Sequence, residues 1–410
     1  MTTSVSDETL RDEVRQWLSE NWTREIAEQL ANEEPTHYTA SPAQRAWLAR
    51  VFEGRWSAPR WDEEWFGRGL SNEQAKIVER EFGRVKAPGT GQDRLNLWAN
   101  TLLARGQPGL KKKLLGPLLK SDVNMCLLYS EPGAGSDLAG IRTRADLKGD
   151  DYIVNGQKVW TSGATTADYG MLIARTDWDV PKHDGISFFF CPMKQEGVEV
   201  RPLRQITDES HFNEVFLSNA VVPAENMLGK PGAGWRVLNT ALAYERSVMG
   251  ESARGSRARS SNAGEAQPLI DLARKAGRLD DPHLRQQLAQ TLSYRRLNAL
   301  NQARAKADLA QGTSSSIMSL GKLAMSRILH EEARLRTEIL GAESLLEGER
   351  YPEADDANFL SLNAYFTSIG GGTDQIQRNI IGERVLGLPK EPEVDKTIAF
   401  RDVKIGVGSG

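Results

Sequence analysis

The sequence predicts an α+β protein that is mostly α, with its helices and strands in separate blocks along the chain. Apolar residues recur at helical spacing in the first and last parts, whereas the middle part is rich in strand-forming runs. Strands and helices do not alternate regularly, so a doubly wound parallel sheet is not expected. We expect a helical domain over residues 1–123, a β domain over 124–230 and a helical domain over 231–410.

The first block shows the period of an amphipathic helix from Glu8 to about Asp122. Leu10, Val14 and Leu18 are spaced four residues apart, and charged or polar residues fill the positions between them. This spacing places the three apolar side chains on one face of a helix.

The middle block has the composition of strands and turns. Tyr152, Ile153 and Val154 form a short β-prone run that leads directly into Asn155-Gly156, a pair typical of two-residue hairpin turns. We therefore expect a hairpin turn at this pair. Further β-prone runs occupy residues 186–190, 198–200, 214–217 and 221–222.

The last block returns to helical spacing after Gly232 and keeps it to about Leu388, where Pro389 ends it. Residues 252–267 interrupt this block because they are rich in Ser, Arg, Gly and Ala. We expect this interruption to be a connection between long helices.

Charge and cysteine content exclude several classes of protein. The net charge of −3 leaves no basic excess for a nucleic acid, and the run 111–113 of three lysines is typical of a solvated helix face. Cys126 and Cys191 lack metal-ligand spacing, so neither a metal site nor a disulfide is expected. The chain shows no signal-peptide pattern and no apolar run of about 18 residues, which predicts a cytoplasmic protein without membrane spans.

One candidate binding segment lies where the helical and β blocks meet, and residues 127–137 read Leu-Leu-Tyr-Ser-Glu-Pro-Gly-Ala-Gly-Ser-Asp. Its alternating glycines let backbone N–H groups approach a ligand, and Ser130 and Ser136 add hydroxyls that can reach the heteroatoms of a flat ring. The GxGxxG pattern of a Rossmann phosphate loop is missing. A glycine-rich connector without a ligand remains the alternative.

A second segment, residues 155–163, presents Trp160 beside Thr161 and Ser162. An indole can stack on a flat heteroaromatic ring while the hydroxyls meet its polar edge, although a tryptophan in a core is the alternative. A third segment, residues 369–387, has three glycines before Thr373, which can cap a helix whose N-terminal N–H groups suit an anion. A flexible loop is the alternative there.

Together these segments, spelled YSEPGAGSD, NGQKVWTSG and GGTDQIQRNIIGERVLGLP, resemble the acyl-CoA dehydrogenase family over nearly the whole chain. The resemblance implies an α-helical domain, a β-barrel domain and a C-terminal four-helix bundle. It also implies FAD-dependent α,β-dehydrogenation of an acyl-CoA thioester to trans-2-enoyl-CoA, with electrons passed to an electron-transferring flavoprotein. Such a protein is expected to be a homotetramer, or a heterotetramer with a related subunit.

The resemblance also implies which residues bind FAD. Contacts to the flavin are expected from Leu127, Leu128, Tyr129, Ser130, Gly135, Ser136, Trp160, Thr161 and Ser162. Further cofactor contacts, including contacts to a neighbouring subunit's FAD, are expected from Arg274, Glu338, Gly341, Thr373, Asp374 and Gln375. Arg274 stands in Arg-Lys-Ala-Gly-Arg, where the family has Arg-x-x-Phe-Gly.

The catalytic base departs from the commoner family pattern. Many members place a glutamate directly before the Gly-Thr pair, where this chain has Gly371. Glu245 is the candidate instead, because it shares a helical stripe with Leu238, Leu242 and Met249. A carboxylate on an apolar stripe is costly unless it is paired, protonated or used. The sequence around it resembles the isovaleryl-CoA branch, whose base is on this helix, and a structural ion pair is the alternative.

Substrate contacts are expected from Ser136, Tyr244, Arg246, Gly371 and Gly372. Arg246 resembles the family's arginine that contacts coenzyme A, and the N–H of Gly371 can donate to the thioester oxygen as negative charge develops there. Two other functions remain open. One is a flavin oxidase or monooxygenase on the same fold, and the other is a non-catalytic partner subunit of a heterotetrameric acyl-CoA dehydrogenase.

Overall fold

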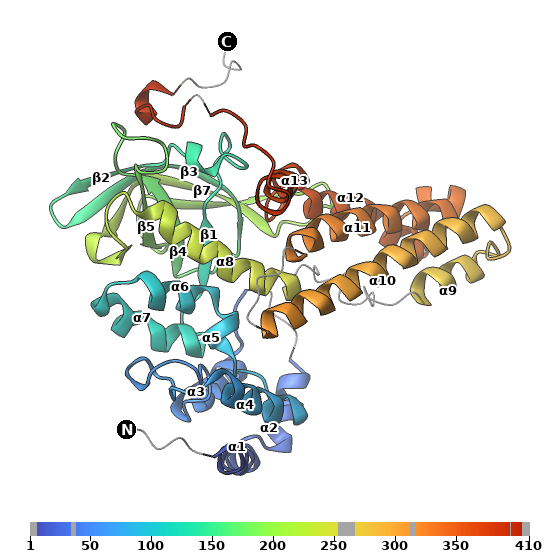
Figure 1. The fold of residues 1–410 in the computed structure, drawn as a ribbon, viewed down its shortest axis with the longest axis horizontal. Coiled ribbons are helices and arrows are strands. Elements are labelled where there is room, and N and C mark those ends of the chain that lie inside the picture. The colour runs from blue at the N-terminus through green and yellow to red at the C-terminus, as the bar shows by residue number, and fades with distance from the viewer. Residues whose placement is uncertain (1–5, 34–37, 253–266, 312–316, 394, 404–410) are drawn as a thin grey trace. The chain divides into compact units, whose positions relative to one another are not determined.

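The computed structural model describes residues 6–33, 38–252, 267–311, 317–393 and 395–403 (Figure 1). These residues form two compact units. Of the described residues, the first unit comprises 6–33, 38–203, 210–251 and 395–403, and the second comprises 204–209, 252, 267–311 and 317–393. The expected connection at 252–267 lies almost wholly outside the described residues. The expected boundaries after residues 123 and 230 stay a prediction.

The N-terminal part of the first unit is helical, as predicted. Leu10, Val14 and Leu18 are all buried, which confirms the stripe expected from their spacing. Ser41 and Ser71 each form a capping box that satisfies backbone N–H groups at the start of a helix. The helices are α1 (Asp7–Asn21), α2 (Arg24–Ala31), α3 (Pro42–Glu53), α4 (Asn72–Arg84), α5 (Gln92–Leu95), α6 (Leu97–Arg105) and α7 (Pro108–Lys120).

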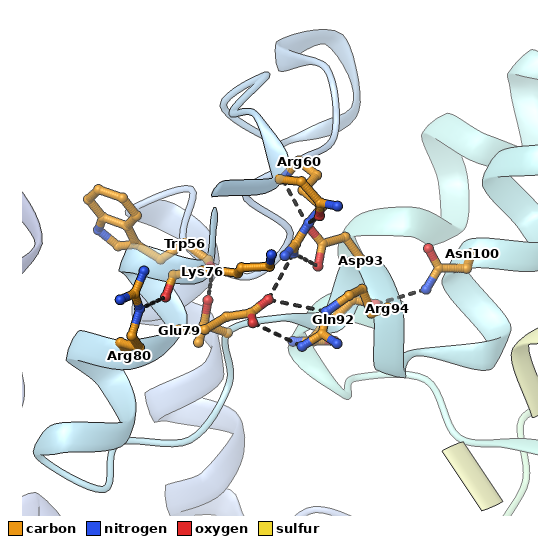
Figure 2. Close-up of polar contacts among 11 residues, drawn as sticks. Trp56, Arg60, Lys76, Glu79, Arg80, Gln92, Asp93, Arg94 and Asn100 are labelled. Atoms are coloured by element: carbon orange, nitrogen blue, oxygen red, sulfur yellow. Dashed lines mark hydrogen bonds and ion pairs between the residues drawn. The ribbon is translucent and has the colours of Figure 1, made fainter. Parts of the chain in front are cut away.

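A network of charged side chains joins the loop before α4 to α4 and α5. Figure 2 shows Arg60, whose Nη1 lies 2.8 Å from Glu79 Oε1 and 3.2 Å from Asp93 Oδ1. Arg94 donates to the other oxygen of Glu79 at 2.9 Å, so one carboxylate joins two arginines. Because Asp93 also accepts from the backbone N–H of Arg60, this loop is fixed against the helices.

The middle part of the first unit is a sheet, whose strand order runs β6-β7-β3-β2-β4-β5-β8, with β1 paired to β4. β1 pairs parallel with β4, while β3 and β7 form a long antiparallel pair. The strands are β1 (Met125–Leu128), β2 (Arg144–Lys148), β3 (Asp151–Ser162), β4 (Tyr169–Arg175), β5 (Ile186–Pro192), β6 (Val198–Leu203), β7 (Phe212–Pro223) and β8 (Met227–Leu228).

The hairpin turn predicted at Asn155-Gly156 is wrong, because both residues lie inside β3. The turn between β2 and β3 is at residues 149–150, where Gly149 has a φ of 63°. Asn155 instead exchanges hydrogen bonds with Asn219 on β7, beside an irregularity in the pairing. A Cβ at Gly156 would lie 2.5 Å from Thr143 Oγ1, so this glycine permits the close approach of β2.

Helix α8 (Gly234–Ser252) follows the sheet and packs on the core of the first unit. A single buried cluster includes Leu115 on α7, Tyr129 after β1, Phe188 on β5 and Leu238 on α8. Helices α7 and α8 therefore share one core with the sheet, and Tyr129, the residue after β1, lies inside it.

The second unit is helical and confirms the return of helical spacing in the last part of the chain. Its helices are α9 (Gln267–Lys275), α10 (Pro282–Ala310), α11 (Met318–Leu340), α12 (Pro352–Ile369) and α13 (Asp374–Ile380), followed by a π-helical turn at Ile381–Val385. With a helical N-terminal part, a middle sheet and a helical C-terminal part, the predicted fold class is confirmed.

The two cysteines are buried and neither forms a disulfide, as predicted. Cys126 on β1 and Cys191 on β5 are both paired with Gly170, so β4 separates them. Two strand spacings amount to about 10 Å, beyond the reach of a disulfide. Burial raises the pKa of both thiols, that of Cys191 to about 12.

We therefore expect both thiols to resist a thiol reagent at pH 8 in the native protein and to react after denaturation. The measurement is a thiol titration with and without guanidinium chloride, which should count two thiols only in the denaturant. Fast reaction of either thiol in the native protein would contradict the burial described above.

Candidate functional site

Two of the candidate segments lie against each other in the first unit. At the end of β1, the carbonyl of Leu127 accepts a hydrogen bond from Thr161 Oγ1 at 3.0 Å. Next along the chain, the carbonyl of Ser130 accepts from the N–H of Val159 at 2.9 Å. Residues 127–130 are thus held along β3, beside Trp160.

A buried ion pair closes the glycine-rich loop of residues 131–143. Lys158 Nζ lies 2.8 Å from Glu131 Oε1, and the two side chains are 0% and 9% exposed. The same carboxylate accepts from the N–H groups of Arg142 and Thr143 at 2.7 and 2.9 Å, where the loop ends. Although burial alone raises it, Lys158 and these donors hold the pKa of Glu131 below its ordinary value. The carboxylate of Glu131, at the start of the loop, therefore also holds the end of the loop.

The backbone at Trp160 is strained, since its φ is 62° and bulky residues rarely adopt this region. The strain coincides with a shift in the pairing of β3 and β7 between Lys158 and Thr161. As a result the indole is 56% exposed, with its ring edge-on to Phe212 at 5.8 Å between centroids. The alternative of a core tryptophan is therefore wrong. Strain of this kind gathers at functional sites, where it aims a side chain at a ligand.

The surface beside Trp160 has room for a flat ligand. Ser136 and the glycines before it are exposed, and a Cβ added at Gly133 or Gly135 would have no atom within 4 Å. Ser130 and Ser162 are half-buried at the same place. An exposed aromatic side chain, nearby hydroxyls and uncrowded glycines are features that a flat ring with polar edges could use.

Some expected flavin residues point away from this surface. The side chains of Leu128, Tyr129 and Thr161 are buried, and Leu127 is half-buried. Thr161 uses its hydroxyl on Leu127. A ligand on this surface would meet the backbone of these residues and the side chains of Ser130, Ser136, Trp160 and Ser162.

Helix α8 brings Glu245 near the end of β1. Leu238 and Ala241 on this helix are buried in the same core as Tyr129, and Glu245 follows one turn later, half-buried. Burial raises the pKa of Tyr129 well above its ordinary value, and the Glu245 carboxylate raises it further. The carboxylate therefore lies within electrostatic reach of Tyr129. Tyr244 packs against the same core, whereas the side chains of Arg246 and Met249 lie outside the described residues.

In the second unit, Thr373 caps α13, because its hydroxyl accepts from the N–H of Ile376. This confirms the cap expected from the sequence. Asp374 accepts from Ser326 Oγ at 2.8 Å and lies 3.4 Å from Lys322 Nζ, so its carboxylate is held against α11. Gly371 and Gly372 have φ values of 65° and 88°, in the region that favours glycine. The turn before α13 thus depends on these glycines.

The remaining expected cofactor residues lie at the end of α9, at the end of α11 and in the first turn of α13. Glu338 accepts from Gln287 Nε2 at 3.1 Å and Arg334 Nη1 at 2.9 Å. Arg274 is exposed and pairs with Asp271 one helical turn earlier. Gly341 ends α11 with a φ of 57°. Of the last stretch, Gln375 lies in the first turn of α13.

Sequence reasoning missed the buried cation that holds the far end of the glycine-rich loop. Arg175 is fully buried at the end of β4 and donates to the carbonyls of Ala139 and Ile141 at 2.7 and 3.1 Å. Burial lowers the pKa of Arg175 to about 10. The available signal was an arginine that ends a strand of otherwise uncharged residues.

No arrangement of three or more His, Cys, Asp and Glu side chains suited to a metal ion occurs among the described residues. Within the same residues, no helix has the length and apolar character needed to cross a membrane.

The sequence matches three family profiles in succession. The description "Acyl-CoA dehydrogenase, N-terminal domain" applies to residues 4–122, "middle domain" to 126–220 and "C-terminal domain" to 232–386. The acyl-CoA dehydrogenase IpdE1 of Mycobacterium tuberculosis is 35% identical over 94% of this chain and 98% of its own length. IpdE1 of Mycolicibacterium smegmatis is 36% identical over 93% of this chain and 97% of its own length.

Solved structures also resemble this chain over nearly its whole length. The Tcur3481-Tcur3483 steroid ACAD has a TM-score of 0.67 and 26% identity, covering 95% of this chain and 99% of its own. The ChsE4-ChsE5 complex from Mycobacterium tuberculosis has a TM-score of 0.64 and 28% identity, covering 95% and 100%. On three matched domains and full-length relatives, this chain belongs to the acyl-CoA dehydrogenase family of FAD-binding flavoprotein enzymes.

Proposed function

We propose that this chain oxidises the Cα–Cβ bond of an acyl-CoA thioester to trans-2-enoyl-CoA, with Glu245 taking the α-proton. The observation that supports this most is the position of Glu245, half-buried on α8 one turn after Ala241, which shares a core with Tyr129. FAD, when bound, would supply the redox chemistry as acceptor of the hydride from Cβ. A positioned carboxylate in a partly desolvated site is a suitable general base for the α-proton.

The backbone at Gly371 supports a base at Glu245. A glutamate base at this position would require an L-residue in the backbone there. Gly371 has a φ of 65°, in the left-handed region that favours glycine. An L-residue in this region costs about 1–2 kcal/mol, so the turn favours glycine. Its N–H remains able to donate to the thioester oxygen. We assign further substrate contacts to Ser136, Tyr244, Arg246 and Gly372.

The flavin ring is proposed to lie on the surface formed by the two adjoining segments, against Trp160. Residues 127–130, Gly135 and Ser136 would contact one edge and Thr161 and Ser162 another, partly through backbone groups. In the second unit, cofactor contacts are proposed for Arg274, Glu338, Gly341, Thr373, Asp374 and Gln375, including contacts to a neighbouring subunit's FAD.

The solved relatives support a proposal about substrate and assembly. One is described as a steroid ACAD and another as a complex of two different chains. We propose a bulky acyl group, because Gly371 has no side chain to occupy space near Cα. We propose a homotetramer or a heterotetramer with a related subunit, located in the cytoplasm and reducing an electron-transferring flavoprotein.

A non-catalytic role is the second candidate, and the lack of a carboxylate at Gly371 favours it. In that case the chain would bind acyl-CoA or stabilise a catalytic partner without oxidising a thioester.

Replacing Trp160 should weaken FAD binding. Trp160→Ala removes a stacking face worth about 0.5–1.5 kcal/mol, or about 2–13-fold in the dissociation constant. Fluorescence titration of the apoprotein with FAD measures this. Leu147→Ala, which removes another exposed apolar side chain from the same unit, is the control and should leave the constant unchanged. Equal FAD affinity in Trp160→Ala and wild type would exclude stacking on this indole.

Glu245→Gln should retain FAD and bind substrate while flavin reduction slows by about 10²–10⁴-fold, because the amide keeps the shape but cannot accept the proton. Stopped-flow absorbance in the flavin band, without oxygen, measures the reduction. Glu199→Gln is the control, since that glutamate forms an exposed pair with Arg201. A rate within a few-fold of wild type would remove Glu245 from the mechanism.

Adding Gly371→Glu to Glu245→Gln should restore part of the rate, because it supplies a carboxylate before the Gly-Thr pair. The matched control is Gly371→Ala in the same background, which imposes the same backbone strain without a carboxylate. Stopped-flow reduction compares the two, and equal rates would show that position 371 does not reach the α-proton. If wild type reduces flavin with no thioester tested, the non-catalytic role is favoured.

A further inference from the structure

The chain returns to its first unit after the last helices, and residues 395–403 pack on the loop between β4 and β5. The short helix η7 (Phe400–Asp402) lies near the red end of the chain in Figure 1. The N–H of Phe400 donates to the carbonyl of Val180 at 2.9 Å, and the N–H of Arg401 to that of Trp178 at 3.0 Å. We call residues 395–403 the C-terminal segment.

Phe400 covers the buried cation at the end of β4. Its ring centroid lies 3.3 Å from Cζ of Arg175, and the ring is only 2% exposed. The guanidinium donates to the carbonyls of Ala139, Ile141 and Lys182. Because the charge faces carbonyl oxygens and an aromatic face, Phe400 both excludes water from it and attracts it. Ala139 and Ile141 lie in the glycine-rich loop, shortly after Ser136.

A second connection runs through Lys182. Its ammonium lies 3.1 Å from Asp395 Oδ2 in the C-terminal segment and 3.3 Å from Asp137 Oδ2 in the glycine-rich loop. The lysine side chain is 11% exposed, so this bridge is better shielded from salt than a surface pair. Asp137 directly follows Ser136, the residue assigned to both FAD and coenzyme A.

We propose that the C-terminal segment positions the glycine-rich loop for ligand binding, with Phe400 acting through Arg175 and Asp395 through Lys182. Neither residue touches the ligand. They restrict the backbone from Asp137 to Ile141, which holds Ser136 where it meets coenzyme A. This inference rests on the proposed function, because it takes the loop as the ligand-binding surface.

The physical basis is preorganisation. A loop that is already ordered loses less conformational freedom when a ligand binds, so the affinity rises without any new contact. Glu131 and Lys158 fix the two ends of this loop, whereas residues 137–141 lie between those ends. Arg175 and Lys182 supply the restraint there, and both depend on the C-terminal segment.

The test uses the FAD-loaded full chain with the variants Phe400→Leu and Asp395→Asn. Calorimetric titration with coenzyme A should show a dissociation constant about tenfold higher for Phe400→Leu, as expected for lost preorganisation. KM for a thioester should rise similarly while kcat stays within about threefold. For Asp395→Asn the loss should be smaller, because this variant removes one ionic bridge and leaves Lys182 its contact with Asp137. Arg401→Ala is the control, since its pair with Asp179 is exposed.

If the C-terminal segment only stabilises the fold, the result will be different. In that case the variants would lower the melting temperature while the coenzyme A constant and KM stayed within twofold of wild type, and the proposal would be wrong. Wild-type protein that binds coenzyme A yet reduces no flavin would refute the proposed dehydrogenation while leaving this positioning role open to the same titration. Phe400→Leu retains apolar cover, so folding should survive, and Asp395→Asn tests the second connection independently.

Discussion

The ion pair between Lys158 and Glu131 is the interaction on which the candidate site depends. Breaking a buried pair by removing one partner costs about 3–5 kcal/mol, because the other charge is left without compensation. Here Glu131 also accepts the two N–H groups that end the loop, and Lys158 donates to the carbonyl of Tyr129. One charge pair therefore holds both ends of the loop and joins the loop to β3, two residues before Trp160.

The second constraint is conformational. Gly371 occupies a left-handed region that a glutamate would enter only with strain, whereas α8 offers a carboxylate on a helix packed into the core of the first unit. A rigid helix positions a base more accurately than a turn of glycines, because packing fixes its rotation. These two observations support the proposal that Glu245 is the base.

The sequence predicted features that depend on neighbours along the chain. Helical spacing placed Leu10, Val14 and Leu18 correctly, and Thr373 caps its helix as expected. The Asn155-Gly156 turn failed because pairing with Asn219, distant in sequence, outweighed a local preference. The contact of Arg175 with Phe400 could not be predicted, since no local pattern joins residues so far apart. The exposure and strain of Trp160 likewise arise from a pairing shift that only the folded sheet defines.

Glu245 is proposed to remove the α-proton, and hydrogen exchange at Cα measures that transfer separately from flavin reduction. Wild-type protein and Glu245→Gln would be incubated with a bound acyl-CoA thioester in D₂O without oxygen, and deuterium at Cα followed by mass spectrometry. We expect deuterium uptake at Cα with the wild type, and loss of this uptake with Glu245→Gln at equal occupancy of the ligand. Undiminished uptake in the variant would contradict it.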